Sequence, residues 1–449
     1  MAFVPIYILI LGFTIVIDYF AGLVIEKSEG KRKKLFLIFS LIANIGVLAV
    51  FKYYNFINEN LSFLCTSFGF VNHIPYLKIL LPIGLSFHTF QAMSYTIEVY
   101  RGNQKAEKHF GIYALYVMFY PQLVAGPIER PQNILHQFYE KHSFNYDRVS
   151  SGLKLMLWGF FKKIVIADNL AIIANKIFND VHQFHGLTLV VGILAFTIQI
   201  FCDFSGYSDI AIGAAEVMGF KLMTNFKRPY FSETISEFWS RWHISLSSWF
   251  KDYLYIPLGG NRVALPRWYF NLFFVFLISG LWHGANWTYI IWGALHGVYL
   301  VVGLITKKIR ANAAAMVGLT KFPVLHKWLN IAVTFCLASF AWIFFRANSF
   351  SDAMYIVKDL AGIRASVTTT ANAVNEVTQK EIHYAGYITV ILCVFLMELV
   401  HFYQENYGSV RLKLAAQKFP VRWFVYIALF FAIILFGAYQ DIQFIYFQF

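Results

Sequence analysis

The sequence predicts an all-α protein that crosses a membrane many times. Of its 449 residues, 58% are hydrophobic and only 14% are charged, whereas a soluble domain is nearer half apolar and a quarter charged. Apolar runs long enough to cross a bilayer as helices recur from one end of the chain to the other. We find no soluble domain between them and therefore predict a single membrane domain over residues 1–449.

Each membrane-crossing helix needs about 20 mostly apolar residues. Runs of this kind occupy residues 3–25, 35–57, 77–97, 151–170, 187–215, 268–282, 287–306, 329–346, 384–403 and 423–439. The segment 110–127 is shorter, and prolines break it, so we expect it to be re-entrant; the total is ten or eleven spans. The segment 231–258 mixes charged residues with Trp, Phe and Tyr, which is typical of helices at a membrane interface or beside a polar cavity.

The distribution of Lys and Arg predicts the orientation of these helices. Residues 26–34 hold five basic residues, residues 58–76 hold none, and residues 101–109 hold three. Because cytoplasmic loops carry the excess of basic residues, we expect the N-terminus outside and residues 26–34 in the cytoplasm. The basic loop 404–422 is then cytoplasmic as well, and the C-terminus is extracytoplasmic.

The formal net charge of +13 also points to the membrane. Its basic residues lie in short loops between apolar runs, where they meet anionic lipid head groups. We therefore expect membrane lipids, and not nucleic acid, to be the partner of this charge. The four cysteines are far apart and form no CxxC pair, so they predict neither a disulfide framework nor a zinc site, and we expect no metal and no bound cofactor.

Several polar residues stand out against the apolar background. His283 and Asn286 lie in the stretch SGLWHGANW, and Asp203 and Asp209 lie in a hydrophobic run. Polar groups in a membrane must find partners, and they often mark functional sites. The six-residue spacing does not stack the two acids on one helical face, so we expect them to pair with Lys or Arg and not to form a carboxylate dyad.

The histidines admit two interpretations on the residues alone. His243 stands next to Arg241 among tryptophans, and His283 is followed by Gly284, which lets a backbone or ligand approach closely. Each is either a buried hydrogen-bonding group that holds helices together or a catalytic group. For His296 we expect only a role in helix packing.

The polar stretches together resemble the membrane-bound O-acyltransferase (MBOAT) family. RWHISLSSWFKDYLYIPLGGNR (241–262) is followed by GLWHGANWTYIIWGALHG (280–297), and upstream lie YPQLVAGPIERP (120–131) and IQIFCDFSGYSDIAIG (198–213). The similarity covers roughly residues 80–300, and it is nearest to bacterial members that acetylate exopolysaccharides such as alginate. Several long motifs in the same order are more specific than any one of them.

The resemblance implies a fold, an activity and a location. The family fold is a ring of tilted helices around a central tunnel, which an acyl donor enters from the cytoplasm and an acceptor from the other side. The implied activity is transfer of acetyl from cytoplasmic acetyl-CoA across a bacterial cytoplasmic membrane to an extracellular or cell-envelope polysaccharide. The family's catalytic histidine, in its WHG motif, corresponds to His283, and a second polar position upstream corresponds to His243.

Acyl transfer from a thioester needs a base for the attacking hydroxyl and donors for the oxyanion. We expect His283 to be the general base and His243 to orient the reactants or stabilise the oxyanion, with Asn286 as a weaker candidate donor. Three basic residues, Lys227, Arg228 and Arg241, are candidates to meet the phosphates of coenzyme A, although lipid anchoring explains their charges as well.

The C-terminal stretch FIYFQF suggests how the acyl group crosses the membrane. It resembles the aromatic-Tyr motif of teichoic acid D-alanylation systems, which makes Tyr446 a candidate acyl carrier; an interfacial tyrosine is the alternative. A periplasmic acyltransferase of the SGNH type is then the expected partner. Other functions left open are D-alanyl transfer to teichoic acid, O-acetylation of peptidoglycan, and transport, although the inverted repeats that a transporter predicts are not evident.

Overall fold

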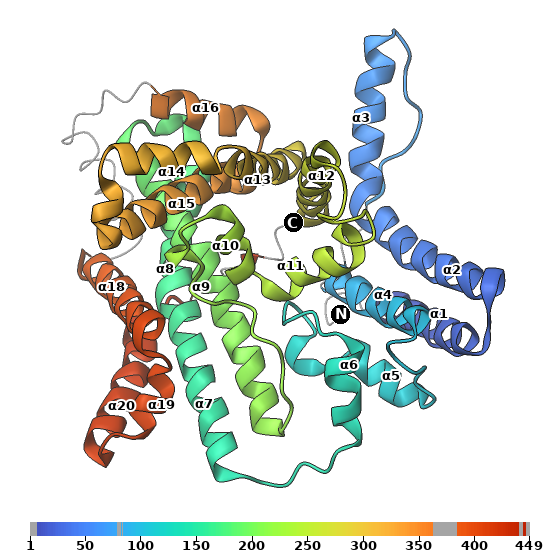
Figure 1. Cartoon of the computed structure of the whole chain (residues 1–449), viewed down its shortest axis with the longest axis horizontal. Helices are drawn as coiled ribbons and strands as arrows, with labels where there is room; N and C mark the ends of the chain where they lie inside the picture. Colours follow the sequence, from blue (N-terminus) through green and yellow to red (C-terminus); the bar gives the residue numbers. More distant parts are fainter. Residues whose placement is uncertain (1–6, 79–81, 83, 362–383, 440–442, 446–449) are drawn as a thin grey trace. The chain divides into compact units, whose positions relative to one another are not determined.

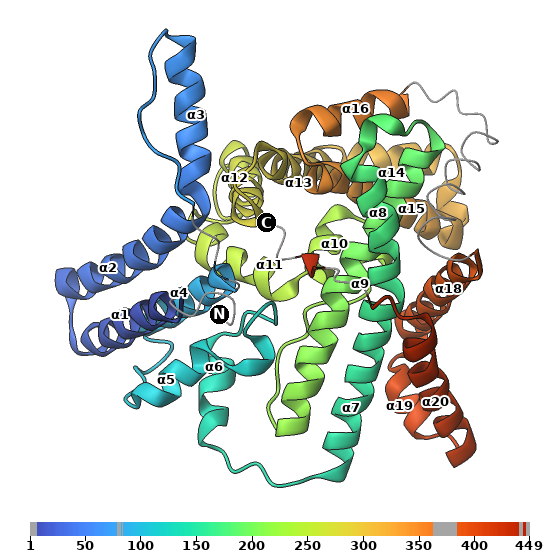
Figure 2. The same ribbon diagram turned by 180° about the vertical axis from the view of Figure 1, so that it is seen from behind.

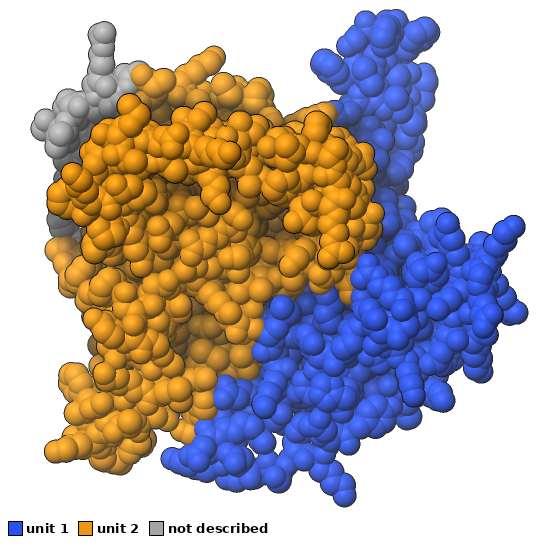
Figure 3. Space-filling view, viewed as in Figure 1, with its two compact units in different colours: residues 1–149, 214–223, 284–286 blue, residues 150–213, 224–283, 287–449 orange. Residues whose placement is uncertain are grey.

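The computed structural model describes residues 7–78, 82, 84–361, 384–439 and 443–445 (Figures 1 and 2). These residues form helices and no β-strand, which confirms the predicted all-α class. The chain divides into two compact units (Figure 3). The first comprises residues 1–149, 214–223 and 284–286, and the second residues 150–213, 224–283 and 287–449.

The first unit is built mainly from the N-terminal helices. Its elements are α1 (Tyr7–Lys27), α2 (Gly30–Leu48), η1 (Ala49–Tyr53), α3 (Tyr54–Ser67), α4 (Leu85–Arg101), α5 (Phe110–Val117), η2 (Tyr120–Gln122), α6 (Pro131–Ile134) and η3 (Leu135–Tyr139). The short helices α5 and η2 replace one continuous helix at the prolines of the segment 110–127, because proline cannot continue a helix.

A buried acid joins three helices inside this unit. Ser40 Oγ on α2 donates to the Asp18 carboxylate of α1 at 2.6 Å and Asn44 Nδ2 donates to it at 2.8 Å. Ser40 Oγ also lies 3.1 Å from Thr96 Oγ1 on α4. Hydrogen bonds of this kind offset the free energy of removing a polar group from water, so they connect the helices specifically.

The second unit contains the motifs around both predicted catalytic histidines. Its elements are α7 (Tyr146–Phe160), η4 (Phe161–Ala167), α8 (Asp168–Asn179), η5 (Val181–Gln183), α9 (Leu187–Met218), η6 (Pro229–Phe231), α10 (Ile235–Arg241), α11 (Ile244–Phe250), η7 (Lys251–Tyr255), α12 (Leu265–His283), α13 (Trp287–Ile305), α14 (Lys307–Met316), η8 (Leu319–Lys321), α15 (Pro323–Arg346), α16 (Phe350–Ala361), α18 (Tyr384–Tyr407), α19 (Val410–Ala415) and α20 (Phe419–Phe436). The start of α7 and the end of α9 count with the first unit.

Helices α7 and α9 run side by side in both views (Figures 1 and 2). Glycines let them touch: a Cβ on Gly159 would lie 2.7 Å from the carbonyl oxygen of Gly206, and a Cβ on Gly213 would lie 2.6 Å from that of Gly152. Small residues at such positions allow helix backbones to approach closely in membranes.

Two lysines of η4 neutralise the acids of α9. Lys162 Nζ lies 2.8 Å from Asp209 Oδ2, and Lys163 Nζ lies 2.8 Å from Asp203 Oδ1. Lys163 also reaches Asp168 at 2.6 Å. The prediction that these acids pair with basic residues, and do not form a dyad, is confirmed.

Seven helices among the described residues are long and apolar enough to cross a membrane. They are Tyr7–Lys27, Gly30–Ser67, Leu187–Met218, Trp287–Ile305, Pro323–Arg346, Ile388–Tyr407 and Phe419–Phe436. The predicted spans 77–97, 151–170 and 268–282 also form helices, α4, α7 with η4, and α12, but these are shorter or more polar. In α4, for example, His88, Gln91 and Glu98 are all buried, so the apolar character of the run is interrupted by groups that face the interior.

Candidate active site

His283 is the last residue of α12, and its side chain is only 5% exposed. Its imidazole packs edge-to-face against the rings of Trp292, at 5.0 Å between centroids, and Phe345, at 5.4 Å. The adjacent Trp282 ring lies 4.9 Å away. Aromatic rings therefore shield this imidazole from bulk solvent and restrict its orientation.

Two glycines explain why α12 and α13 approach so closely. A Cβ on Gly280 would collide with the carbonyl oxygen of Tyr289, and a Cβ on Gly293 would collide with that of Phe276. The absence of a side chain at both positions lets the two backbones touch. This contact brings the end of α12 against α13 and thereby places His283 beside Trp292.

His296 lies on α13, about one turn after Trp292. It is fully buried, and its Nδ1 accepts a hydrogen bond from Trp239 Nε1 at 3.1 Å. Trp292 contacts this ring as well, at 5.1 Å between centroids. These contacts confirm the helix-packing role expected for His296.

His243 has an unusual backbone conformation. It precedes α11 with φ 42° and ψ 55°, in the left-handed region, and Arg228 is the only other described non-glycine residue with positive φ. An L-amino acid with a Cβ is strained in this region. Such strain persists where the surroundings hold the residue in place, and it is concentrated at functional sites.

The Asn225 side chain determines which ring nitrogen of His243 carries the proton. The backbone N–H of Ser245 lies 3.2 Å from Asn225 Oδ1, and Asn225 Nδ2 lies 3.3 Å from Ser208 Oγ. Because a backbone N–H can only donate, the atom it meets is the amide oxygen. That oxygen lies 3.1 Å from His243 Nδ1, so Nδ1 is the donor and Nε2 carries the lone pair in the neutral ring.

Burial keeps the His243 imidazole neutral. The side chain is 0% exposed, and removal from water lowers the pKa of His243 from 6.5 to about 3. The cationic form is therefore disfavoured throughout the physiological pH range. A neutral ring with its lone pair at Nε2 can accept a proton or a hydrogen bond there.

Both predicted catalytic histidines adjoin one aromatic cluster, formed by Trp242, Trp342 and Trp292. The Trp242 and Trp342 ring centroids are 5.1 Å apart, and those of Trp342 and Trp292 are 5.6 Å apart. His283 packs on Trp292, and His243 packs on Phe204, which is linked to Trp242 through the Phe226 ring. Helices α12, α13 and α15 and the segment before α11 thus contribute to one continuous set of aromatic contacts.

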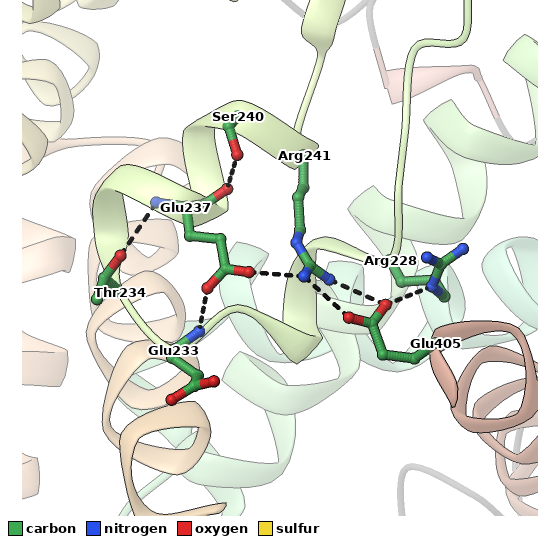
Figure 4. A network of polar contacts seen from close by, with 7 residues as sticks. All are labelled: Arg228, Glu233, Thr234, Glu237, Ser240, Arg241 and Glu405. Atoms are coloured by element: carbon green, nitrogen blue, oxygen red, sulfur yellow. Dashed lines mark hydrogen bonds and ion pairs between the residues drawn. The ribbon is translucent and has the colours of Figure 1, made fainter. Parts of the chain in front are cut away.

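The predicted donor-binding residues have partners of their own (Figure 4). Arg228 Nε lies 2.7 Å from Glu405 Oε2, and Arg241 reaches the two oxygens of Glu405 at 2.9 and 3.1 Å. Arg241 also pairs with Glu237 at 2.6 Å. Lys227 is exposed, and its backbone N–H donates to the Arg241 carbonyl at 2.9 Å. The structure brings the two arginines together on the Glu405 carboxylate, with Glu237 also paired to Arg241.

The structure does not place the other two predicted site residues, Asn286 and Tyr446, in this site. Asn286 is half-buried in the short loop between α12 and α13, and it counts with the first compact unit. Tyr446 lies outside the described residues. In the described part of the chain, no group of three or more His, Cys, Asp or Glu side chains is placed to hold a metal ion.

The residues just before Tyr446 are buried in the second unit. The Ile445 backbone N–H donates to Asp203 Oδ2 at 2.9 Å, and the Phe444 ring stacks on Tyr207 at 5.1 Å between centroids. Phe204 contacts Phe444 at 6.4 Å and His243 at 4.6 Å. Phe444 therefore lies one aromatic ring away from His243.

Sequence reasoning missed Asn225 and Glu405. Nothing in the sequence connects Glu405 with Arg228, 177 residues away, or Asn225 with His243. Glu237 was more accessible to inference, because it precedes Arg241 by four residues and so faces it on a helix.

Comparisons with known proteins identify relatives of this chain. Residues 108–347 match the model of the MBOAT, membrane-bound O-acyltransferase family. A probable alginate O-acetylase AlgI of Pseudomonas putida is 43% identical over 338 residues, which cover 74% of this chain and 66% of that protein. A peptidoglycan O-acetyltransferase of Helicobacter pylori is 36% identical over 442 residues, covering 89% of this chain and 81% of that protein.

More distant similarity reaches the teichoic acid D-alanyltransferase of Bacillus subtilis, 26% identical over 62% of this chain and 72% of that protein. The chain spans slightly less than two thirds of the length of the alginate O-acetylases, 66% and 64% in two of them. Residues 108–347, which match the family model, contain both histidine motifs and the whole aromatic cluster. The chain is therefore a multi-pass membrane protein that belongs to the membrane-bound O-acyltransferase family.

Proposed function

We propose that this protein is a membrane O-acyltransferase that takes acetyl from acetyl-CoA and delivers it to hydroxyl groups of an envelope polysaccharide. The family match and the O-acetylating relatives support this activity. The observation that carries it is the pair of buried histidines joined through one network of aromatic rings, one of them held in a strained conformation with a defined tautomer.

The chemical step requires one base and one nucleophile. The imidazole of His283 removes the proton from an attacking hydroxyl as its oxygen bonds to the thioester carbonyl carbon. The carbon–sulfur bond then breaks, and the leaving thiolate takes the proton to give free coenzyme A. The aromatic side chains around His283 keep bulk water, a competing nucleophile, away from the thioester.

His243 is suited to orienting the nucleophile. An oxyanion is stabilised by donors, whereas the proton of the neutral His243 ring is on Nδ1 and engaged with Asn225. Its Nε2 can accept a hydrogen bond from the incoming hydroxyl. Of the two roles expected from the sequence, the geometry thus favours orientation over oxyanion stabilisation, and Asn286 remains a proposed donor.

The reaction is proposed to run across a bacterial cytoplasmic membrane. Basic loops on the cytoplasmic side suit the anionic donor, and Lys227, Arg228 and Arg241 remain candidates for its phosphates. The acceptor lies on the opposite side, so an acyl carrier is needed, for which Tyr446 is proposed. A periplasmic SGNH-type acyltransferase would then complete the transfer.

Peptidoglycan is a second candidate acceptor beside an alginate-like polysaccharide. The relative named peptidoglycan O-acetyltransferase aligns over 89% of this chain and 81% of its own length, more of both than the alginate O-acetylases. Mass spectrometry of envelope polymers with and without the gene distinguishes the alternatives. Loss of acetyl from one polymer identifies the acceptor, whereas loss of D-alanine from teichoic acid would contradict acetyl transfer.

Replacement of the proposed base tests the activity directly. His283→Ala and the more conservative His283→Gln should each lower polymer acetylation by about 100-fold or more, since general base catalysis typically contributes 10²–10⁴. The exposed His73 provides a matched control, because His73→Ala removes an imidazole far from the aromatic cluster in sequence. Undiminished acetylation by a folded, membrane-inserted His283→Ala protein would contradict the proposed function.

A further inference from the structure

Two chain segments are joined along their backbones at His243. The Ile244 N–H donates to the Asn225 carbonyl at 2.9 Å, and the Lys227 N–H donates to the Arg241 carbonyl, also at 2.9 Å. The first segment, 225–228, supplies Asn225, and the second, 241–245, supplies His243. The position of the imidazole therefore depends on how these segments are held against each other.

The strain in this part of the chain is concentrated in the same two segments. Arg228, with φ 47°, and His243, with φ 42°, are the only non-glycine residues with positive φ in the described chain, and each segment contains one. Backbone conformations of this kind are strained for residues with a Cβ. Contacts elsewhere must offset this strain, or both residues would relax to ordinary conformations.

Glu405 on α18 makes such contacts with both segments. Its carboxylate accepts from Arg228 Nε at 2.7 Å and from Arg241 Nη1 and Nη2 at 3.1 and 2.9 Å. Figure 4 shows the carboxylate between the two guanidinium groups, with Glu237 on the other side of Arg241. The side chain of Glu405 is 14% exposed, so these ion pairs are screened less than surface pairs.

We propose that Glu405 is a positioning residue for His243, which clamps segments 225–228 and 241–245 together and so maintains the strained backbone and the Nδ1–Asn225 hydrogen bond. The proposal rests on the proposed function, in which His243 orients the nucleophile. Glu405 does not touch the imidazole; it acts through Arg228 and Arg241 and the backbone hydrogen bonds between them.

The charges argue for this role over donor binding by the same arginines. Arg228 and Arg241 carry two positive charges, and Glu405 and Glu237 supply two negative ones. Charge-assisted pairs of this geometry are strong. An anionic donor would have to displace these carboxylates from the arginines. The positioning role requires only the ion pairs that are present in the structure.

The test compares Glu405→Gln, which keeps the shape and removes the charge, with Glu405→Asp and with a matched control. Glu398 lies on the same helix, and its described ion pair is with His401, at 3.5 Å, and not with an arginine of either segment, so Glu398→Gln is the control. Release of free thiol from acetyl-CoA is measured with the full chain in membrane vesicles that contain the acceptor polymer. Each variant is made in the wild type and in a His243→Asn background.

Glu405→Gln should lower kcat about 10- to 100-fold, since small misplacements of an orienting group have effects of that size. KM for acetyl-CoA should change less than about twofold, and Glu405→Asp should recover part of the rate. In the His243→Asn background, Glu405→Gln should cause no further loss. An equal loss in both backgrounds would show a general structural role, and a raised KM with unchanged kcat would show donor binding; either result overturns the proposal.

A second measurement does not depend on activity. Diethyl pyrocarbonate modifies accessible imidazoles, and His243 is fully buried. Mass spectrometry should show His243 modified several-fold faster in Glu405→Gln and in Glu405→Asp than in the wild type or Glu398→Gln. If His243 is modified at the same rate in the Glu405 variants as in the wild type, the proposed positioning role of Glu405 is overturned, even where no thiol release is detected. A wild-type chain that releases no thiol contradicts the proposed function instead.

Discussion

At position 243 the chain places a histidine in a backbone conformation that glycine and asparagine adopt most easily. The side chain is buried, neutral, and bonded through Nδ1 to the Asn225 oxygen. The arrangement presents Nε2 in one protonation state and one orientation, which is what the proposed role in receiving a hydroxyl requires.

The lowered pKa of His243 predicts how stability depends on pH. The pKa is about 3 in the folded protein and 6.5 in the unfolded chain. Between these values only the unfolded chain binds the proton, so this residue's contribution to stability is present above pH 6.5 and is lost as the pH falls toward 3. From pH 7 to pH 5 the loss is about 2 kcal/mol.

His243→Asn should remove that dependence, because asparagine tolerates the left-handed backbone and does not titrate. Thermal unfolding of the detergent-solubilised protein at pH 7 and pH 5 measures it. The unfolding midpoint of the wild type should fall more between these pH values than that of the variant. Equal decreases would show that His243 does not have the depressed pKa.

Among the helices, the contact between α12 and α13 is the one that places His283. It depends on glycines whose backbones touch, with no room for a methyl group at Gly280 or Gly293. Because α12 ends at His283, a small separation of the two helices moves the imidazole away from Trp292. Precision at the site thus comes from the packing of whole helices as well as from hydrogen bonds.

Gly280→Ala tests this contact against Gly303→Ala. The added methyl group at position 280 should force the helices apart and destabilise the protein by about 1–3 kcal/mol, with loss of acetyl transfer. Gly303 lies on α13, and a Cβ added there would have no heavy atom within 4 Å, so alanine should be neutral or stabilise the helix by up to about 1 kcal/mol. Thermal midpoints and transfer rates are measured together. Identical behaviour of the two variants would contradict the role of this helix contact.

At the scale of the whole molecule, the proposed function requires an acyl group to pass from a cytoplasmic donor to an external polymer. Phe444 and Ile445, which precede Tyr446 in the sequence, are buried, and the Ile445 N–H donates to Asp203. Phe204 contacts both Phe444 and His243. Residues 444 and 445 are thereby tied to the same helix, α9, that packs on the proposed orienting histidine.

Tyr446→Phe removes only the hydroxyl that the proposed relay requires. It should abolish polymer acetylation by cells, while acetyl-CoA binding to the purified protein is kept. Tyr439→Phe is the matched control: Tyr439 is exposed, and its hydroxyl donates to the Ile433 carbonyl at 2.7 Å. Normal acetylation in the Tyr446→Phe strain would end the relay hypothesis without affecting the role of His283.

Much of the fold follows from the sequence, because apolar runs in a membrane can only be helices. The pairing of Asp203 and Asp209 with lysines was also predictable, since an unpaired acid in such a run is too costly. The same reasoning singled out both histidines as unusual polar residues, and the family resemblance predicted their catalytic roles. It could not identify Glu405 or Asn225, because their partners lie far away in sequence and meet only in the folded chain. Nor does composition reveal that position 243 has positive φ.

The left-handed backbone at His243 has a practical consequence for alanine scanning. Alanine at this position would remove the imidazole and would also be strained by about 1–2 kcal/mol. Loss of activity in an alanine variant could therefore result either from the missing imidazole or from local misfolding. Asparagine or glycine at position 243 separates the two effects, and so they are the informative replacements in any mutational survey of this protein.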